Sequence, residues 1–212
     1  MEPKRWPPRS HEATSHSSCG ERWFDGTGPM DATEAAVHFA QALQKAKIPH
    51  AIGGAIAYGF FGAARGTHDV DINLFVGEEE AGGAIDALVS AGLVIDRSLA
   101  LESAHDRGDA RGMFQGLPVD LFFNSIPAHE RAAGRTRRVT LHHVPIDVLS
   151  PEDTAIFKML FFRGKDLVDI ERLLSLMGDT LDRAFVRGSL VEVVGEEDYR
   201  VKKWDELVSA LS

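Results

Sequence analysis

The stretch from Ile52 to Val76, IGGAIAYGFFGAARGTHDVDINLFV, carries the strongest structural signal in this 212-residue chain. From Asp69 onward, polar and apolar residues alternate with the period of two that is typical of a half-buried strand. We therefore predict a strand over 69–76 that places Asp69 and Asp71 on one face. The opposite, core-facing side would be formed by Val70, Ile72, Leu74 and Val76.

A glycine pair, Gly53-Gly54, precedes this strand and follows a short predicted strand at 50–52. The apolar segment 55–63 is typical of a buried helix, and Arg-Gly-Thr at 65–67 is typical of a turn. Glycines that lead from a strand into a helix leave backbone N–H groups free at the helix N-terminus, where they can bind phosphate. Gly-Gly alone is common in turns, so the prediction of a phosphate-binding turn depends on the Asp-Val-Asp strand that follows.

Two aspartates at positions i and i+2 of a strand project from the same face, with Cα atoms roughly 6.6 Å apart. Their charges repel each other unless a cation lies between them. Hard oxygen ligands suit Mg²⁺, and a third carboxylate on a neighbouring strand would complete a site for two ions about 3.5–4 Å apart. Asp120, in a predicted strand at 117–123, is the candidate. We expect Asp69, Asp71 and Asp120 to be metal ligands and catalytic residues.

The rest of the chain predicts an α+β fold, with strands and helices mixed in the first two thirds and helices alone at the end. We expect a core over 30–149, a mixed sheet flanked by helices, followed by a C-terminal helical bundle over 150–212. The further strands are expected over 93–99, 111–114 and 144–149. The further helices are expected over 32–46 with Asp31 and Glu34 as a capping box, over 78–91, from Ser150-Pro151 to Phe162, from about Asp166, and once or twice over 179–211.

Several charged residues outside the aspartate strand have two possible interpretations. Lys158 lies on an apolar helix, so its amine either reaches solvent or meets an anion. Asp166 would cap the following helix, with Asp169 in the same first turn. His68 is expected to be packed. The basic residues of the segment 131–143 form either a solvated loop and strand edge or a local phosphate-binding patch; they are Arg131, Arg135, Arg137, Arg138, His142 and His143.

Composition sets the class of protein. Residues 1–29 lack apolar periodicity and are rich in proline, serine and glycine, so we expect a disordered leader. The single cysteine, Cys19, lies in this leader and excludes an internal disulfide, which fits a cytoplasmic location. A net charge of −9 argues against non-specific coating of nucleic acid. No segment reaches the ~20 apolar residues that span a bilayer, so no membrane partner is expected.

The motif Ile52-Gly53-Gly54, fourteen intervening residues and Asp69-Val70-Asp71-Ile72 resembles the signature of the polymerase-beta-like nucleotidyltransferase superfamily. The spacer is at or just past the long end of the usual range. The C-terminal third narrows the resemblance to the AbiEii/MenT-type branch, through VLSPED at 148–153, Lys158 and RGKDLVDI at 163–170. The similarity extends over about 48–174.

This resemblance implies an enzyme that moves a nucleoside monophosphate from an NTP, with Mg²⁺, to an acceptor hydroxyl. It adds Lys158 to the catalytic residues. It also implies nucleotide contacts from Gly53, Gly54, Arg65, Thr67, Lys165, Asp166 and Asp169, where Arg65 could pair with the carboxylates instead.

Members of the branch include toxins of toxin–antitoxin pairs, some of which transfer nucleotides onto tRNA 3′ ends. An RNA acceptor and an antitoxin partner are therefore implied. Two alternatives stay open: an aminoglycoside-type enzyme with a small-molecule acceptor, and a catalytically silent nucleotide-binding module.

Overall fold

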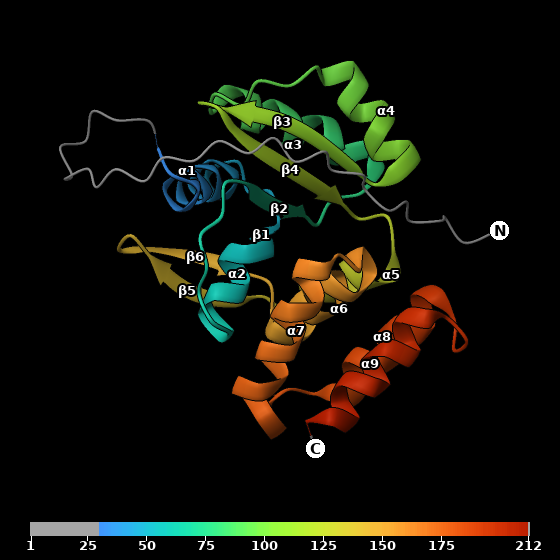
Figure 1. Cartoon of the computed structure of the whole chain (residues 1–212). Coiled ribbons are helices and arrows are strands. Elements are labelled where there is room, and N and C mark those ends of the chain that lie inside the picture. Colours follow the sequence, from blue (N-terminus) through green and yellow to red (C-terminus); the bar gives the residue numbers. More distant parts are fainter. Residues whose placement is uncertain (1–29, 212) are drawn as a thin grey trace.

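The computed structural model describes residues 30–211, so the predicted leader 1–29 with Cys19 lies outside the described residues. Six strands form one mixed sheet in the order β3-β4-β2-β1-β6-β5 (Figure 1). The strands are β1 (His50–Ile52), β2 (Val70–Leu74), β3 (Asp109–Phe114), β4 (Leu117–Phe123), β5 (Arg137–Leu141) and β6 (Val144–Val148). The helices are α1 (Ala32–Lys45), α2 (Gly54–Phe61), α3 (Glu78–Ser90), α4 (Arg97–Arg107), α5 (Pro127–Ala133), α6 (Pro151–Phe161), α7 (Gly164–Met177), α8 (Arg183–Val194) and α9 (Tyr199–Ala210), with a 3₁₀ turn at Gly178–Thr180.

The strand pairing brings the predicted acidic strands side by side. β2 runs antiparallel to β1 and parallel to β4, and β1 runs parallel to β6. The two outer strands, β3 and β5, are the antiparallel hairpin partners of β4 and β6. The central position of β2 therefore fixes its aspartates between the glycine turn after β1 and the residues of β4.

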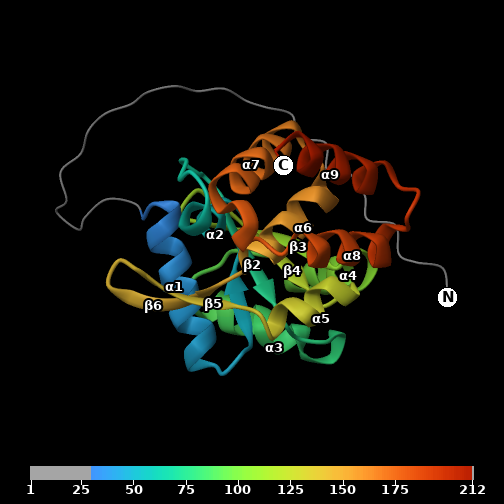
Figure 2. The same ribbon diagram turned by 90° about the horizontal axis from the view of Figure 1, so that it is seen from below.

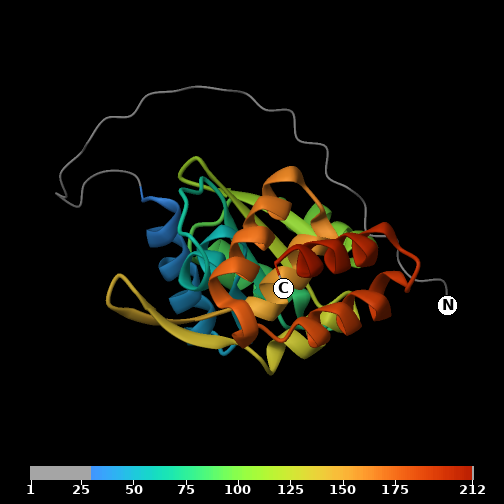
Figure 3. The ribbon, with the colours of Figure 1, turned by 60° about the horizontal axis from the view of Figure 1, so that its bottom comes forward.

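Helices cover both faces of the sheet. α1 contacts β1, β2, β6 and α3. On the other side, α6 contacts α2, α7 and α8, and α2 also contacts α7. Figure 2 shows the strands between α1 and α3 on one side and α7 and α9 on the other. Figure 3 shows the β5–β6 hairpin projecting from this body.

The core confirms the predicted period of two in β2. Val70, Ile72 and Leu74 are completely buried, and Val76 is nearly so. The buried apolar residues of the sheet and of the C-terminal helices form one continuous cluster. The division into a core over 30–149 and a helical subdomain over 150–212 stays a prediction.

Two predicted helix starts are confirmed by their caps. The Asp31 carboxylate accepts from the Thr33 and Glu34 N–H groups, and Glu34 Oε2 accepts from the Asp31 N–H at 2.9 Å. Ser150 Oγ accepts from the Asp153 N–H at 3.1 Å, with Pro151 at the first helical position. Both caps satisfy N–H groups that a helix start leaves without internal partners.

Two local predictions were wrong, and two elements were not predicted. Residues 93–99 are not a strand: only Val94 forms a bridge, with Met113, and the Asp96 carboxylate then caps α4. Only Ala100 of α4 is fully buried, so this helix has almost no apolar periodicity to reveal it. Asp166 is not the N-cap residue of α7, because the helix begins at Gly164. It occupies the third helical position, and its carboxylate accepts from the backbone N–H of the N-cap residue Arg163. The helix α5 and the strand β5 were not predicted.

Within residues 30–211, every helix is either too short or too polar to cross a membrane.

Candidate active site

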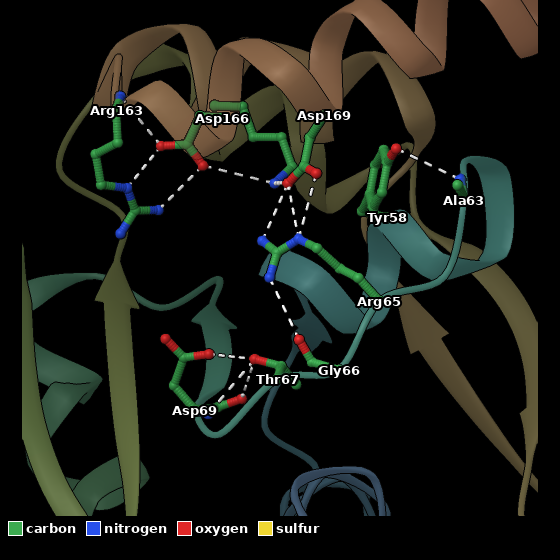
Figure 4. A network of polar contacts seen from close by, with 10 residues as sticks. Tyr58, Ala63, Arg65, Gly66, Thr67, Asp69, Arg163, Asp166 and Asp169 are labelled. Carbon is green, nitrogen blue, oxygen red and sulfur yellow. Dashed lines mark hydrogen bonds and ion pairs between the residues drawn. The ribbon is translucent and has the colours of Figure 1, made fainter. Parts of the chain in front are cut away.

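The sheet register places the three predicted carboxylates together. Asp71 on β2 is the direct Cα partner of Asp120 on the parallel strand β4. Asp69 lies two residues before Asp71, at the entry to β2, and its Oδ1 accepts a hydrogen bond from the Thr67 hydroxyl (Figure 4). Side chains two residues apart on a strand share a face. Neighbouring strands therefore bring Asp69, Asp71 and Asp120 to one side of the sheet.

The glycine turn lies against this cluster. The Gly53 N–H donates to the Asp71 carbonyl at 2.8 Å, which joins the end of β1 to β2. Gly54 has a φ of +57°, and a Cβ at this position would lie 1.7 Å from Asp71 Oδ2. Only glycine combines this left-handed backbone with such a close approach. The start of α2 is thereby held directly beside the Asp71 carboxylate.

The cluster concentrates negative charge. Burial raises the pKa of the Asp71 carboxyl to about 7, and the charges of Asp69 and Asp120 act in the same direction. Two like charges held close together disfavour the ionised form of each other. A cation bound among these groups would relieve both the burial penalty and the repulsion.

An open cavity of about 660 Å³ lies in front of the cluster. Asp69 is the acidic residue of its lining, and the other charged lining residues are Arg65, Arg111, Arg163 and Lys165. Gly66, Thr67, His68 and Pro118 complete the wall, so His68 is exposed here and the prediction that it packs is wrong. An acidic centre with a cationic rim suits a ligand that carries phosphates on a metal ion.

A buried ion-pair network ties this cavity to the C-terminal helices (Figure 4). The Lys158 amine, 4% exposed on α6, donates to Asp169 Oδ2 at 2.7 Å. The Arg65 guanidinium donates to the same carboxylate from the turn before β2, through Nη2 at 3.0 Å and Nε at 3.2 Å. Although burial opposes it, the hydrogen bonds from Arg65 and Lys158 hold the pKa of Asp169 below its usual value. Of the two possibilities for Lys158, the structure shows contact with an anion.

The remaining predicted residues lie at the start of α7. Asp166 is completely buried and accepts from Arg163, from Nε at 2.6 Å and from the backbone N–H at 3.3 Å. Lys165 is exposed and faces the open cavity. Asp166 and Asp169 thus bind cations of the protein itself, whereas Lys165 is free to approach a ligand from the rim.

Two arginines of the site, Arg111 and Arg163, were not predicted. Arg163 lines the cavity beside Lys165, and Arg111 is the direct partner of Asp120 across the β3–β4 hairpin. The sequence does contain a signal for the second pairing. A two-residue turn at Gln115-Gly116, both with positive φ, fixes the hairpin register and so aligns Arg111 with Asp120.

A small enclosed cavity of about 30 Å³ lies behind Asp71, between the sheet and α6. Its polar lining includes Asn73 and Thr154, neither of which was predicted. Among the described residues, Thr154 Oγ1 is buried and has no hydrogen-bond partner. The cavity has room for a water molecule that could bind this hydroxyl.

The basic segment 131–143 does not form one patch. Arg131 pairs with Glu192 on α8. Arg135 pairs with Glu152 and Asp153 and stacks on Phe185, with its guanidinium carbon 3.8 Å from the ring centre. The β5–β6 hairpin carries the other four residues, which are Arg137, Arg138, His142 and His143. Arg138 pairs with Asp147, and His142 Nε2 lies 2.6 Å from the Thr33 hydroxyl.

The described residues, 30–211, contain no group of three or more His, Cys, Asp or Glu side chains arranged to bind one metal ion. Both carboxylate oxygens of Asp120 accept from Arg111 instead, at 2.6 and 2.7 Å.

Comparison with solved structures shows the fold. The solution structure of the antibiotic-resistance factor ANT(2'')-Ia matches with a TM-score of 0.51 at 14% identity, over 85% of this chain and 92% of that one. The crystal structure of ANT(2'')-Ia in complex with adenylyl-2''-tobramycin matches with a TM-score of 0.52 at 13% identity, over 84% and 95%. No protein-family model and no curated protein sequence matches the chain. The chain therefore has an α+β nucleotidyltransferase fold, as predicted.

Proposed function

We propose that this protein is a nucleotidyltransferase that moves a nucleoside monophosphate from an NTP to an acceptor hydroxyl. The observation that carries the proposal is the position of Asp69, Asp71 and Asp120 beside the Gly54 turn, in front of a cavity with a cationic rim. A silent nucleotide-binding module would need no such concentration of carboxylates, whose mutual repulsion costs stability.

The carboxylates fit a magnesium ion. Asp69 and Asp71 offer hard oxygen donors from one strand face. A bound cation would offset the burial and the charges of Asp69 and Asp120, which together raise the pKa of Asp71. These two residues are the proposed Mg²⁺ ligands. When bound, Mg²⁺ would draw charge from the triphosphate and favour attack at the α-phosphorus.

The chain's own residues would bind the triphosphate and fix its orientation. Backbone N–H groups at the start of α2 and the rim cations Arg65, Arg163 and Lys165 would bind phosphate oxygens. The Lys158 amine would act indirectly. It donates to Asp169, the same carboxylate that holds Arg65 in position. Positioning of this kind supplies most of the rate in phosphoryl-type transfers.

The proposed reaction is an in-line displacement. The acceptor oxygen forms a bond to the α-phosphorus while the bond from that phosphorus to the α,β-bridging oxygen breaks. Pyrophosphate leaves with the bridging oxygen, and the hydroxyl proton passes to the water of the open cavity.

We propose an RNA acceptor, with the 3′ end of cytoplasmic tRNA first, and the role of a toxin with an antitoxin partner. This follows the AbiEii/MenT resemblance, and a second cavity supports it. The cavity measures about 340 Å³, shares Arg65, Gly66 and Thr67 with the first one, and contains the exposed ring of Phe60. Aromatic rings stack well on unpaired bases. The β5–β6 hairpin reaches the same cavity through Leu141, which places its basic residues nearby.

The alternative acceptor is a small aminoglycoside, as the tobramycin-adenylate complex of ANT(2'')-Ia suggests. A polycationic drug would be repelled by the positive charges that line the open cavity, which are Arg65, Arg111, Arg163 and Lys165. This charge pattern favours an anionic acceptor.

The decisive experiment incubates the protein with Mg²⁺, each α-labelled NTP in turn, and either total tRNA or tobramycin. We expect label on tRNA with the wild type and none with Asp71→Asn. Label on tobramycin alone would select the small-molecule enzyme. NTP binding without transfer to any acceptor would select the silent module.

A further inference from the structure

We infer that Arg111, held by Asp120, takes the place of a second metal ion, so that this protein binds one divalent ion per chain. The inference rests on the proposed function and changes the expected two-ion site. Asp120 is then a positioning residue for a phosphate-binding arginine and does not bind metal.

The pairing of Arg111 with Asp120 is built into the sheet. The two residues are Cα partners in the antiparallel β3–β4 hairpin, and Asp120 is in turn the partner of Asp71. One row across the sheet therefore reads carboxylate, carboxylate, guanidinium. Because strand register is fixed by the core and by the Gln115-Gly116 turn, no loop movement can separate the members of this row.

Arg111 binds both oxygens of the Asp120 carboxylate. Arg111 Nε donates to Asp120 Oδ1 at 2.6 Å and Nη2 donates to Oδ2 at 2.7 Å, a two-pronged geometry that is among the strongest ion pairs in proteins. The Asp120 side chain is 6% exposed, whereas that of Arg111 is 41% exposed. Release of Arg111 would leave a buried carboxylate without this partner, which is costly.

Charge balance leads to the same conclusion. Three carboxylates are neutralised by one divalent ion and one guanidinium. The pKa of Arg111 is raised by its hydrogen bonds to Asp120 and, further, by the charges of Asp69 and Asp71, so the guanidinium lies in the field of the whole cluster. A second divalent ion at Asp120 would be repelled by the fixed positive charge of Arg111.

The exposed side of Arg111 explains what the arrangement does. Its side chain lines the open cavity with the other rim cations. A fixed guanidinium there can bind the departing pyrophosphate, the task that a second ion performs in two-ion sites.

The test counts bound Mn²⁺ by isothermal titration calorimetry, in the presence of an NTP analogue with a methylene bridge between the α- and β-phosphates. We expect one ion for the wild type, one for Asp120→Asn and none for Asp71→Asn. Two ions for the wild type and one for Asp120→Asn would overturn the inference and leave the proposed function intact. No ion in any of them would remove the premise of both.

Arg111→Ala completes the test. We expect this variant to bind a second Mn²⁺ ion at the released Asp120. A single ion in this variant would show that Arg111 does not exclude the second one. The matched control is Arg107→Ala, an arginine that pairs with Asp109 at 3.3 Å outside the cavity lining. It should keep one ion.

Discussion

Gly54 and Asp71 are packed so closely that a single methyl group does not fit between them, since a Cβ on Gly54 would lie 1.7 Å from Asp71 Oδ2. Gly54→Ala must also hold alanine at a φ of +57°, which costs about 1–2 kcal/mol before the clash is counted. We expect the variant to lose roughly 2–4 kcal/mol of unfolding free energy and its Mn²⁺ binding. Urea unfolding and calorimetry measure the two effects.

The control for this prediction is Gly83→Ala. Gly83 lies within α3, and nothing stands within 4 Å of a Cβ added there. Alanine in a helix interior is more favourable than glycine by about 0.5–1 kcal/mol. Equal stability losses in both variants would contradict the role given to the Gly54–Asp71 approach.

Lys158 should behave as a buried ion-pair partner. Lys158→Met leaves Asp169 and Asp166 with fewer cations, and removal of one partner from a buried pair typically costs about 3–5 kcal/mol. We expect a loss in that range by urea unfolding. Lys203→Met, which breaks the exposed pair with Glu206, should cost under about 1 kcal/mol. Similar losses of unfolding free energy in the two variants would contradict this prediction.

His129 should make stability sensitive to acid. Burial lowers its pKa to about 3, while an unfolded histidine titrates near 6.5. A depressed pKa in the folded state means that the unfolded chain takes up the proton first. Stability from this residue is therefore full above about pH 6.5 and is lost as the pH falls towards 3, by up to roughly 1.4 kcal/mol per pH unit.

The variant His129→Gln has no such proton uptake. It should be less stable than the wild type at pH 8, because the stacking of His129 on Phe157 is lost, but its stability should fall less between pH 6.5 and 4. The exposed His105 supplies the control variant His105→Gln. Urea unfolding at several pH values compares the slopes, and parallel slopes for wild type and His129→Gln would count against the prediction.

The basic segment can be divided by experiment. Arg135→Glu places a carboxylate against Glu152 and Asp153, so we expect at least about 2–3 kcal/mol of destabilisation. Arg137 is exposed on β5, and Arg137→Glu should leave stability within about 0.5 kcal/mol. The same variant should lower label transfer to tRNA several-fold without changing NTP affinity, because it removes a phosphate contact. Unfolding curves and the transfer assay give both readouts.

The strand beside Asp69 and Asp71 could be predicted from the sequence, because polar and apolar residues alternate along a half-buried strand. It could not reveal α4, whose exposed position leaves almost no apolar pattern. The Arg135 contacts were also hidden, because they join the segment between α5 and β5 to residues of α6 and α8 that are distant along the chain.

The role of Arg111 was not predicted from the sequence. Its importance comes from a hairpin register that the turn residues Gln115-Gly116 encode locally. For Lys158, a lysine on an apolar helix indicated contact with an anion, but the sequence did not identify Asp169 as that anion.

The shared carboxylate of Asp169 has a consequence for how the protein would lose activity. Arg65 belongs to the segment before β2, whereas Asp169 and Lys158 belong to α7 and α6. Detachment of the C-terminal helices in mild denaturant would release Arg65 from its anchor on Asp169. The proposed transfer activity would therefore depend on the docking of these helices, which share one continuous core with the sheet.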